Sequence, residues 1–120
     1  MAAGKRRWPP SSGTSVKAPD ARVFAALGDP TRLRIVVRLA RGEPLSITEL
    51  ASGTEVTRQA VTKHLHVLAA AGVASSARKG REERWSLDQK QLVQARQFLD
   101  RIAQQWDDRL ASLKAFVEDS

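Results

Sequence analysis

Residues 57–72 of this 120-residue chain are Thr-Arg-Gln-Ala-Val-Thr-Lys-His-Leu-His-Val-Leu-Ala-Ala-Ala-Gly, and they predict a helix with two different faces. Its apolar residues recur at helical spacing and would face a core; they are Ala60, Val61, Leu65, Leu68 and Ala69. The polar side chains between them are of types that contact base edges or phosphates in duplex DNA; they are Arg58, Gln59, Thr62, Lys63 and His66. Gly72 ends the pattern, as glycine often does one position past a helix C-cap. By itself the pattern is also typical of a surface helix with a polar face.

A shorter helix is predicted just upstream, over residues 45–51. Ser46 is its expected N-cap, and Glu49 follows three residues later, at the spacing of a capping box. Residues 52–56 contain a glycine and interrupt the helical pattern before the second helix begins. Two helices joined by so short a break have the layout of a helix-turn-helix.

Two short strands are predicted downstream, over residues 73–77 and 83–87, on either side of the basic stretch 78–81. Trp85 and Leu87 show the period-two alternation of a strand with one buried face. A basic hairpin directly after a helix-turn-helix is a wing. The sequence therefore predicts a mainly α fold with a small two-stranded β wing, a winged helix-turn-helix.

In their order and spacing, four stretches of the chain resemble the ArsR family of winged-helix bacterial repressors. They are Ala26-Leu-Gly-Asp-Pro-Thr-Arg-Leu-Arg-Ile-Val36, Ile47-Thr-Glu-Leu-Ala51, Val61-Thr-Lys-His-Leu-His-Val-Leu-Ala-Ala-Ala-Gly-Val73 and Gly80-Arg-Glu-Glu-Arg-Trp-Ser-Leu87. The resemblance covers residues 20–87, and a further helix is expected after them. It implies a homodimer that binds double-stranded operator DNA near its own promoter and represses transcription.

The resemblance also implies which residues contact DNA. The expected major-groove contacts are Arg58, Gln59, Thr62 and Lys63. Secondary candidates on the same helix are Thr57 and His66. The wing candidates for the DNA backbone or minor groove are Arg78, Lys79, Arg81 and Arg84. The alternative is a winged-helix module that binds protein; a polar and basic face over residues 58–66 favours DNA, because a protein-binding face would be apolar.

The distribution of charge agrees with a DNA-binding surface. The chain carries a net charge of +7, and residues 56–87 contribute six basic and two acidic side chains, a net +4. Residues 1–19 contribute another +4 with no acid, whereas residues 20–55 are neutral and residues 88–120 carry −1. Such clustering is typical of a surface that binds phosphates, although basic charge also serves solubility.

The segment before the helix-turn-helix predicts two more helices. Residues 20–27 form a short amphipathic pattern, and residues 31–40 have the wide apolar arc of a central core helix. Asp29 is the expected N-cap of the second, with Pro30 at its first position, where the missing N–H costs nothing. Arg32 is predicted to brace the loop between the two helices rather than to contact DNA.

The longest helical pattern runs from Asp88 to Ser120 without glycine or proline. A helix of about 30 residues is about 45 Å long, which exceeds what so small a core can cover. We therefore expect a two-fold dimer through the N- and C-terminal helices, with packing within one chain as the alternative. The predicted interface residues are Val23, Phe24, Leu27, Leu99, Ile102, Trp106, Leu110 and Leu113.

The sequence predicts no metal site and no cofactor. The chain has no cysteine, so thiolate ligands and disulfides are excluded. Its two histidines, His64 and His66, are two positions apart and diverge by about 200° on a helix, so they cannot hold one ion together. His64 is predicted to pack or to brace the helix. Metal-sensing members of the family use cysteines or Asp and His pairs that are missing here; whether an unknown small-molecule effector exists is left open.

An enzyme is not expected, because no nucleophile, base and orienting group fall into a recognisable pattern. Residues 1–19 hold three of the five prolines and few large apolar side chains, which predicts a disordered basic tail before a domain over residues 20–120. No apolar run approaches the roughly 18 residues that span a bilayer, and Lys5-Arg-Arg7 is not followed by a secretory apolar segment. We expect a soluble, cytoplasmic protein without a membrane partner.

Overall fold

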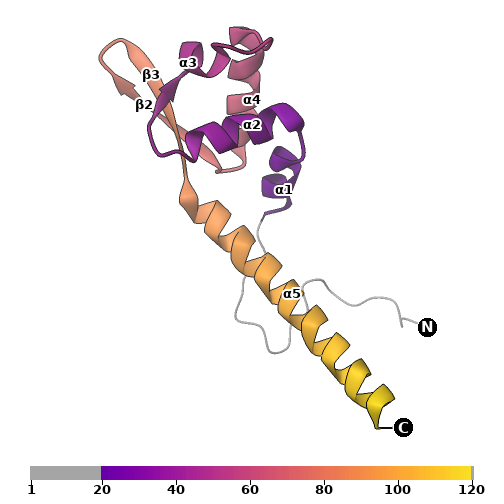
Figure 1. Cartoon of the computed structure of the whole chain (residues 1–120). Coiled ribbons are helices and arrows are strands. Elements are labelled where there is room, and N and C mark those ends of the chain that lie inside the picture. The colour runs from indigo at the N-terminus through magenta and orange to yellow at the C-terminus, as the bar shows by residue number, and fades with distance from the viewer. Residues whose placement is uncertain (1–19, 120) are drawn as a thin grey trace, which may run out of the picture. The chain divides into compact units, whose positions relative to one another are not determined.

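The computed structural model describes residues 20–119, and the predicted tail, residues 1–19, lies outside this range. The described chain falls into two units, a winged-helix unit over residues 20–92 and a second unit over residues 93–119. In chain order the elements are α1 (Ala21–Leu27), α2 (Pro30–Leu39), β1 (Leu45–Ser46), α3 (Ile47–Ala51), α4 (Arg58–Ala70), β2 (Ala74–Lys79), β3 (Glu82–Leu87) and α5 (Gln89–Glu118) (Figure 1). All five predicted helices and the predicted hairpin are confirmed.

Side-chain caps begin the first three helices. Asp20 accepts a hydrogen bond from the backbone N–H of Arg22, and Asp29 accepts from those of Thr31 and Arg32, with proline at the first position of α2. The predicted capping box of α3 is confirmed: Ser46 Oγ accepts from the Glu49 N–H at 3.1 Å, and Glu49 Oε1 accepts from the Ser46 N–H at 3.0 Å. These bonds satisfy backbone donors that a helix leaves unpaired at its start.

Glycine ends α4 as predicted. Gly72 has φ +77°, in the left-handed region that side chains with a Cβ avoid. The N–H of Val73 donates to the Leu68 carbonyl at 2.9 Å, and the N–H of Gly72 donates to the Ala69 carbonyl at 3.0 Å. This pair of bonds is the Schellman motif, which turns the chain directly from α4 into the wing.

The wing belongs to a three-stranded antiparallel sheet in the order β1-β3-β2. The sequence predicted only two strands, because β1 consists of two residues and two residues show no alternation. In β1, Leu45 pairs with Trp85 and Ser46 pairs with Arg84. The hairpin is also longer than predicted: β2 and β3 pair up to Lys79 and Glu82, which leaves a two-residue turn.

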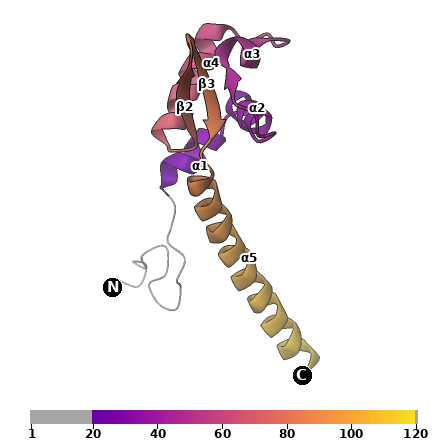
Figure 2. The same ribbon diagram turned by 90° about the vertical axis from the view of Figure 1, so that its left-hand side faces the viewer.

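The core of the winged-helix unit forms around the apolar face of α4. Val61, Leu65 and Leu68 of this helix are almost completely buried, as the sequence predicted. They are buried together with residues of α1, α2, α3, β2, β3 and the turn after α4; the most buried of these are Val23, Ala26, Ile35, Leu39, Leu50, Val73, Ala74 and Trp85. Helix α4 packs beside β2 (Figure 2), so the core fixes α4 and the hairpin against each other. Each fully buried Leu or Val contributes about 1.5–3 kcal/mol.

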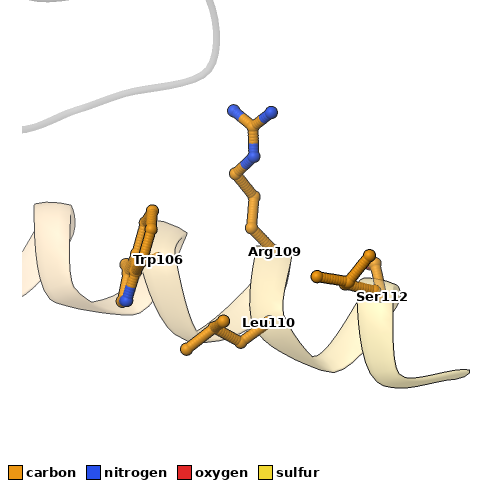
Figure 3. Close-up of a pocket in the computed structure, with 5 residues that line it drawn as sticks. Trp106, Arg109, Leu110 and Ser112 are labelled. Carbon is orange, nitrogen blue, oxygen red and sulfur yellow. The ribbon is translucent and has the colours of Figure 1, made fainter. Parts of the chain in front are cut away.

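Helix α5 has 30 residues and continues beyond the winged-helix unit. Most large apolar side chains of α5 from Leu99 onward are exposed; they are Leu99, Trp106, Leu110, Leu113, Phe116 and Val117. Trp106, Arg109, Leu110, Ser112 and Leu113 line an open hollow, and all five come from this one helix (Figure 3). Because one helix supplies all of these side chains, the hollow is a shallow groove on the surface of α5 rather than an enclosed pocket. Among the described residues, no helix is both long and apolar enough to cross a membrane.

Candidate nucleic-acid interface

The first half of α4 presents the predicted major-groove residues together. At about 100° per residue, positions 58, 59, 62 and 63 span an arc of about 140° on one side of the helix. Arg58, Gln59 and Lys63 are exposed, whereas Thr62 is partly buried and its Oγ1 donates to the Arg58 carbonyl at 2.8 Å. The buried core stripe lies on another side of the same turns, so the exposed side chains of Arg58, Gln59 and Lys63 point away from the core.

The two secondary candidates on this helix have structural partners as well. Thr57 is the N-cap of α4, and its Oγ1 accepts from the Ala60 N–H at 3.0 Å. Sequence reasoning placed Thr57 among the DNA contacts and missed this role, although a threonine directly before a helical pattern is a cap signal. The exposed ring of His66 lies beside that of Trp85 in β3, with the ring centroids 6.2 Å apart.

The hairpin register places the four basic wing residues on two opposite faces of the hairpin and in its turn. Residues directly opposite each other point to the same face, and faces alternate along each strand. Arg78, opposite Glu83, therefore lies on the face of Trp85, whereas Lys79 and Arg84 lie on the other face. Arg81 is in the turn. Arg78, Lys79 and Arg81 are exposed, and Arg84 is partly buried.

Arg84 is engaged with other parts of the winged-helix unit. Its Nη2 lies 2.8 Å from Glu82 Oε1, and its Nη1 lies 3.7 Å from Glu49 Oε1. The same Nη1 donates to the Pro44 carbonyl at 3.2 Å. That Arg84 contacts DNA stays a prediction.

The carboxylate of Glu49 connects α3 to this arginine. Its pKa is held below the ordinary value first by the hydrogen bond from the Ser46 N–H and further by the positive charges of Arg84 and Arg38. Arg38 Nη1 also donates to the carbonyls of Glu49 and Leu50, each at 3.0 Å. Ionised Glu49 therefore caps the first helix of the motif and faces the wing at the same time.

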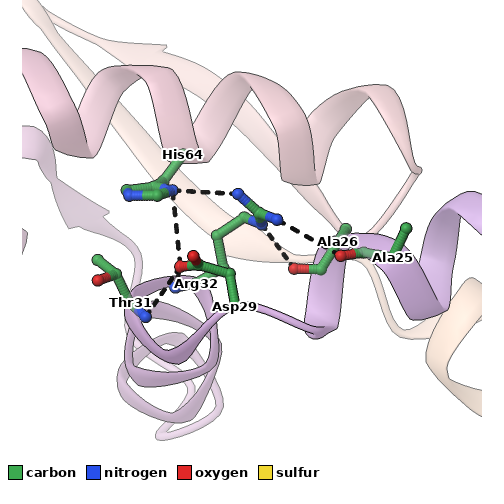
Figure 4. A network of polar contacts seen from close by, with 6 residues as sticks. All are labelled: Ala25, Ala26, Asp29, Thr31, Arg32 and His64. Carbon is green, nitrogen blue, oxygen red and sulfur yellow. Dashed lines mark hydrogen bonds and ion pairs between the residues drawn. The ribbon is translucent and has the colours of Figure 1, made fainter.

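A second polar network fixes α4 to the corner between α1 and α2 (Figure 4). Arg32 Nε donates to the Ala26 carbonyl at 2.7 Å, and its Nη1 lies 3.3 Å from His64 Nδ1. Asp29 Oδ2 is 4.0 Å from the same ring nitrogen, and hydrogen bonds to its carboxylate, foremost from the Arg32 N–H, lower the pKa of Asp29. The predicted bracing roles of Arg32 and His64 are confirmed.

The predicted dimer residues divide into buried and exposed ones. Val23 is completely buried within the chain, and Phe24 on the next position of α1 is 36% exposed. Leu27 and Ile102 are partly exposed. Those with large exposed area are Leu99, Trp106, Leu110 and Leu113. Within residues 20–119 no three His, Cys, Asp or Glu side chains gather as metal ligands would.

Comparison with known proteins gives consistent matches. A family model described as a helix-turn-helix domain matches residues 27–76. The HTH-type transcriptional regulator Rv2034 of Mycobacterium tuberculosis is 41% identical over 89 residues, which cover 74% of this chain and 81% of that protein. A transcriptional repressor SmtB homolog of Synechocystis is 39% identical over 67 residues, 56% of this chain and 50% of the relative. The structure of an ArsR-like transcriptional regulator from Rhodococcus sp. RHA1 superimposes with a TM-score of 0.74 at 41% identity and covers 83% of this chain and 91% of that one.

Proposed function

Since the chain belongs to the ArsR family of helix-turn-helix transcription regulators, which bind DNA and are not enzymes, we propose that it is a homodimeric repressor. Each protomer places α4 in the major groove of one operator half-site. The wing then lies along the flanking backbone or minor groove. Repression agrees with the resemblance to a relative that is named as a repressor.

One observation carries this proposal: Arg58, Gln59 and Lys63 are exposed and Thr62 is partly exposed on one arc of a helix whose other side is buried. In helix-turn-helix proteins the N-terminal residues of the second helix contact base edges, and these four lie in the first two turns of α4. Arginine makes bidentate hydrogen bonds with guanine, and glutamine makes them with adenine. Thr57 and His66 flank this arc and are proposed as phosphate contacts.

The proposed dimer rests on α5. Leu99, Trp106, Leu110 and Leu113 form an exposed apolar stripe along it, and a two-fold axis brings the same surface of a second copy against this stripe. Phe24 and Leu27 of α1 add exposed apolar area to this interface, and Val23 supports it from within the core. Two protomers present two α4 helices, which matches an operator made of two half-sites.

The proposed repressor does not sense metal through thiolates, because the chain has no cysteine. Any effector would be a small molecule of another kind. The alternative of a protein-binding module predicts no sequence preference on DNA and no effect of the α4 arc on DNA affinity.

The decisive experiment separates base reading from phosphate binding. An operator is first selected from a random duplex pool with the full-length protein, and affinities are then measured on operator and scrambled duplexes at several salt concentrations. Gln59→Ala should cost about 1–3 kcal/mol on the operator and relax the preference at one position of each half-site. Arg78→Ala should weaken all duplexes alike and lower the salt slope by about one unit per lost contact.

Arg34→Ala is the matched control, since it removes an exposed arginine of α2, outside both α4 and the wing. It should leave the sequence preference unchanged. If selection enriches no sequence, or if Gln59→Ala leaves the preference unchanged while Arg78→Ala alters it, the proposed arrangement is wrong.

A further inference from the structure

Arg84 stands where the sheet narrows from three strands to two. Ser46 of β1 and Ala77 of β2 pair with it from both sides. Beyond it, Glu83 and Glu82 pair with β2 alone, so the tip of the wing has no third strand. A two-stranded hairpin is marginally stable in water, and its direction must be fixed at its base.

The guanidinium of Arg84 connects three separate segments at this base. It contacts Glu82 within the wing, Glu49 at the start of α3 and the carbonyl of Pro44 in the loop before β1. The planar fork of arginine can serve several acceptors at fixed angles, which a lysine ammonium cannot do in the same way. Glu49 is itself held in place by the capping box.

The same surroundings disfavour a phosphate at Arg84. Two carboxylates lie within 4.0 Å of its guanidinium, at 2.8 and 3.7 Å, so an approaching phosphate would have to compete with both of them for this side chain. The side chain is 34% exposed, and its Nε is buried without a hydrogen-bond partner among the described residues. Arg78, Lys79 and Arg81 are exposed by contrast.

We infer that Arg84 is a positioning residue: its fork ties the wing to α3 and to the loop before β1, and so sets where the exposed basic residues of the wing lie on DNA. The inference rests on the proposed function, because it assigns Arg84 to holding the wing rather than to the DNA contact that the sequence predicted. The same contacts should hold the hairpin in the free protein. Without the fork, the tip of the hairpin, residues 78–83, should open more often.

Three variants isolate the fork. Arg84→Lys keeps the positive charge but loses the fork, and Arg84→Met removes both. Glu49→Gln keeps the capping box, since glutamine also accepts from the Ser46 N–H, but removes the charge that faces Arg84. Arg78→Met is the matched control, because it removes an exposed charge from the same hairpin.

The first measurement is amide hydrogen exchange of residues 76–83 in the free protein. Both Arg84 variants should speed exchange there by about threefold or more, Glu49→Gln should do so more weakly, and Arg78→Met should leave it unchanged. Circular dichroism confirms that each variant is folded. If Arg84→Met does not fold, the Arg84→Lys and Glu49→Gln proteins decide the outcome. Unchanged exchange in the folded variants overturns the inference, whether or not the protein binds an operator.

The second measurement is the salt dependence of operator affinity. Both Arg84 variants should weaken binding by a similar factor and leave the salt slope at the wild-type value. Arg78→Met should lower the slope by about two units per dimer, one for each copy. If Arg84→Met lowers the salt slope as much as Arg78→Met does, and Arg84→Lys keeps the wild-type slope, Arg84 is a phosphate contact and the inference is wrong. If wild-type protein shows no operator preference, the proposed function fails, and the exchange measurement still decides the role of Arg84.

Discussion

Gly72→Ala is expected to destabilise the winged-helix unit for two separable reasons. The first is conformational: φ is +77° at this position, and a residue with a Cβ loses about 1–2 kcal/mol in the left-handed region. The second is steric, since an added Cβ would lie 3.0 Å from Cγ of Gln91. Moving the Gln91 side chain off its rotamer costs about 0.5–1.5 kcal/mol. The free energy of unfolding should therefore fall by about 1.5–3.5 kcal/mol.

Gly53→Ala provides the control for the conformational part. Gly53 has nearly the same φ, +75°, and nothing lies within 4 Å of an added Cβ. Its cost should be about 1–2 kcal/mol. Both variants change the entropy of the unfolded chain alike, so the difference between them measures the contact with Gln91. Urea titration of each protein, followed by circular dichroism, gives the two free energies.

A Gln91→Ala background tests the steric contribution. In a Gln91→Ala protein the obstructing Cγ is absent, and Gly72→Ala should then cost no more than Gly53→Ala. If Gly72→Ala costs the same in both backgrounds, the close approach of Gln91 does not contribute. If it costs less than about 0.5 kcal/mol in either, glycine is not required at the end of α4 and the reasoning from φ is refuted.

The remaining predictions address dimerisation, metals, pH and the core. Replacing Leu99 and Ile102 together by aspartate should produce monomers in sedimentation and abolish operator binding, and a dimer that persists would contradict the proposed interface. Operator affinity should change less than a few-fold with zinc, cadmium, nickel or arsenite, and release of DNA by any of these at nanomolar concentration would show a metal site. Because the pKa of Asp29 is lowered, its ionised form stabilises the fold above the ordinary value of 3.8, and this stability is lost as the pH falls through the lowered value. Asp29→Asn keeps the N-cap and should make acid unfolding less steep; an unchanged acid transition would contradict this. Leu65→Ala, at a position with 0% exposure, should cost about 2–5 kcal/mol in urea unfolding, and a cost below 1 kcal/mol would show that the α4 stripe is not the core.

Features that depend on neighbours in sequence could be predicted. The helices were found because their apolar positions repeat at helical spacing, and their starts because caps are local: Asp29, Ser46 and Glu49 all bond within three residues. Gly72 could be assigned for the same reason. Thr57 shows the limit of this reasoning, because one residue type fits both a cap and a phosphate contact.

Features that depend on residues far apart in the chain could not be predicted. Strand β1 has two residues, and it exists only because Leu45 and Ser46 meet β3, about 40 positions later. The contact between Arg84 and Pro44 spans the same separation. No pattern within either segment indicates the pairing, since strand registers are set by the folded core.

In the wing, strand pairing determines which basic residues lie close to an acidic side chain. The sequence places four basic residues there and treats them alike. In the folded hairpin Arg78 is opposite Glu83, Lys79 is opposite Glu82, and Arg84 contacts two carboxylates. Arg81, in the turn, has no residue opposite it in the strand register. Because opposite charges across a strand pair offset each other's field, the turn is where the positive potential of the wing should be highest. We therefore propose that the tip of the wing meets the phosphates first and that its base sets the direction of the hairpin.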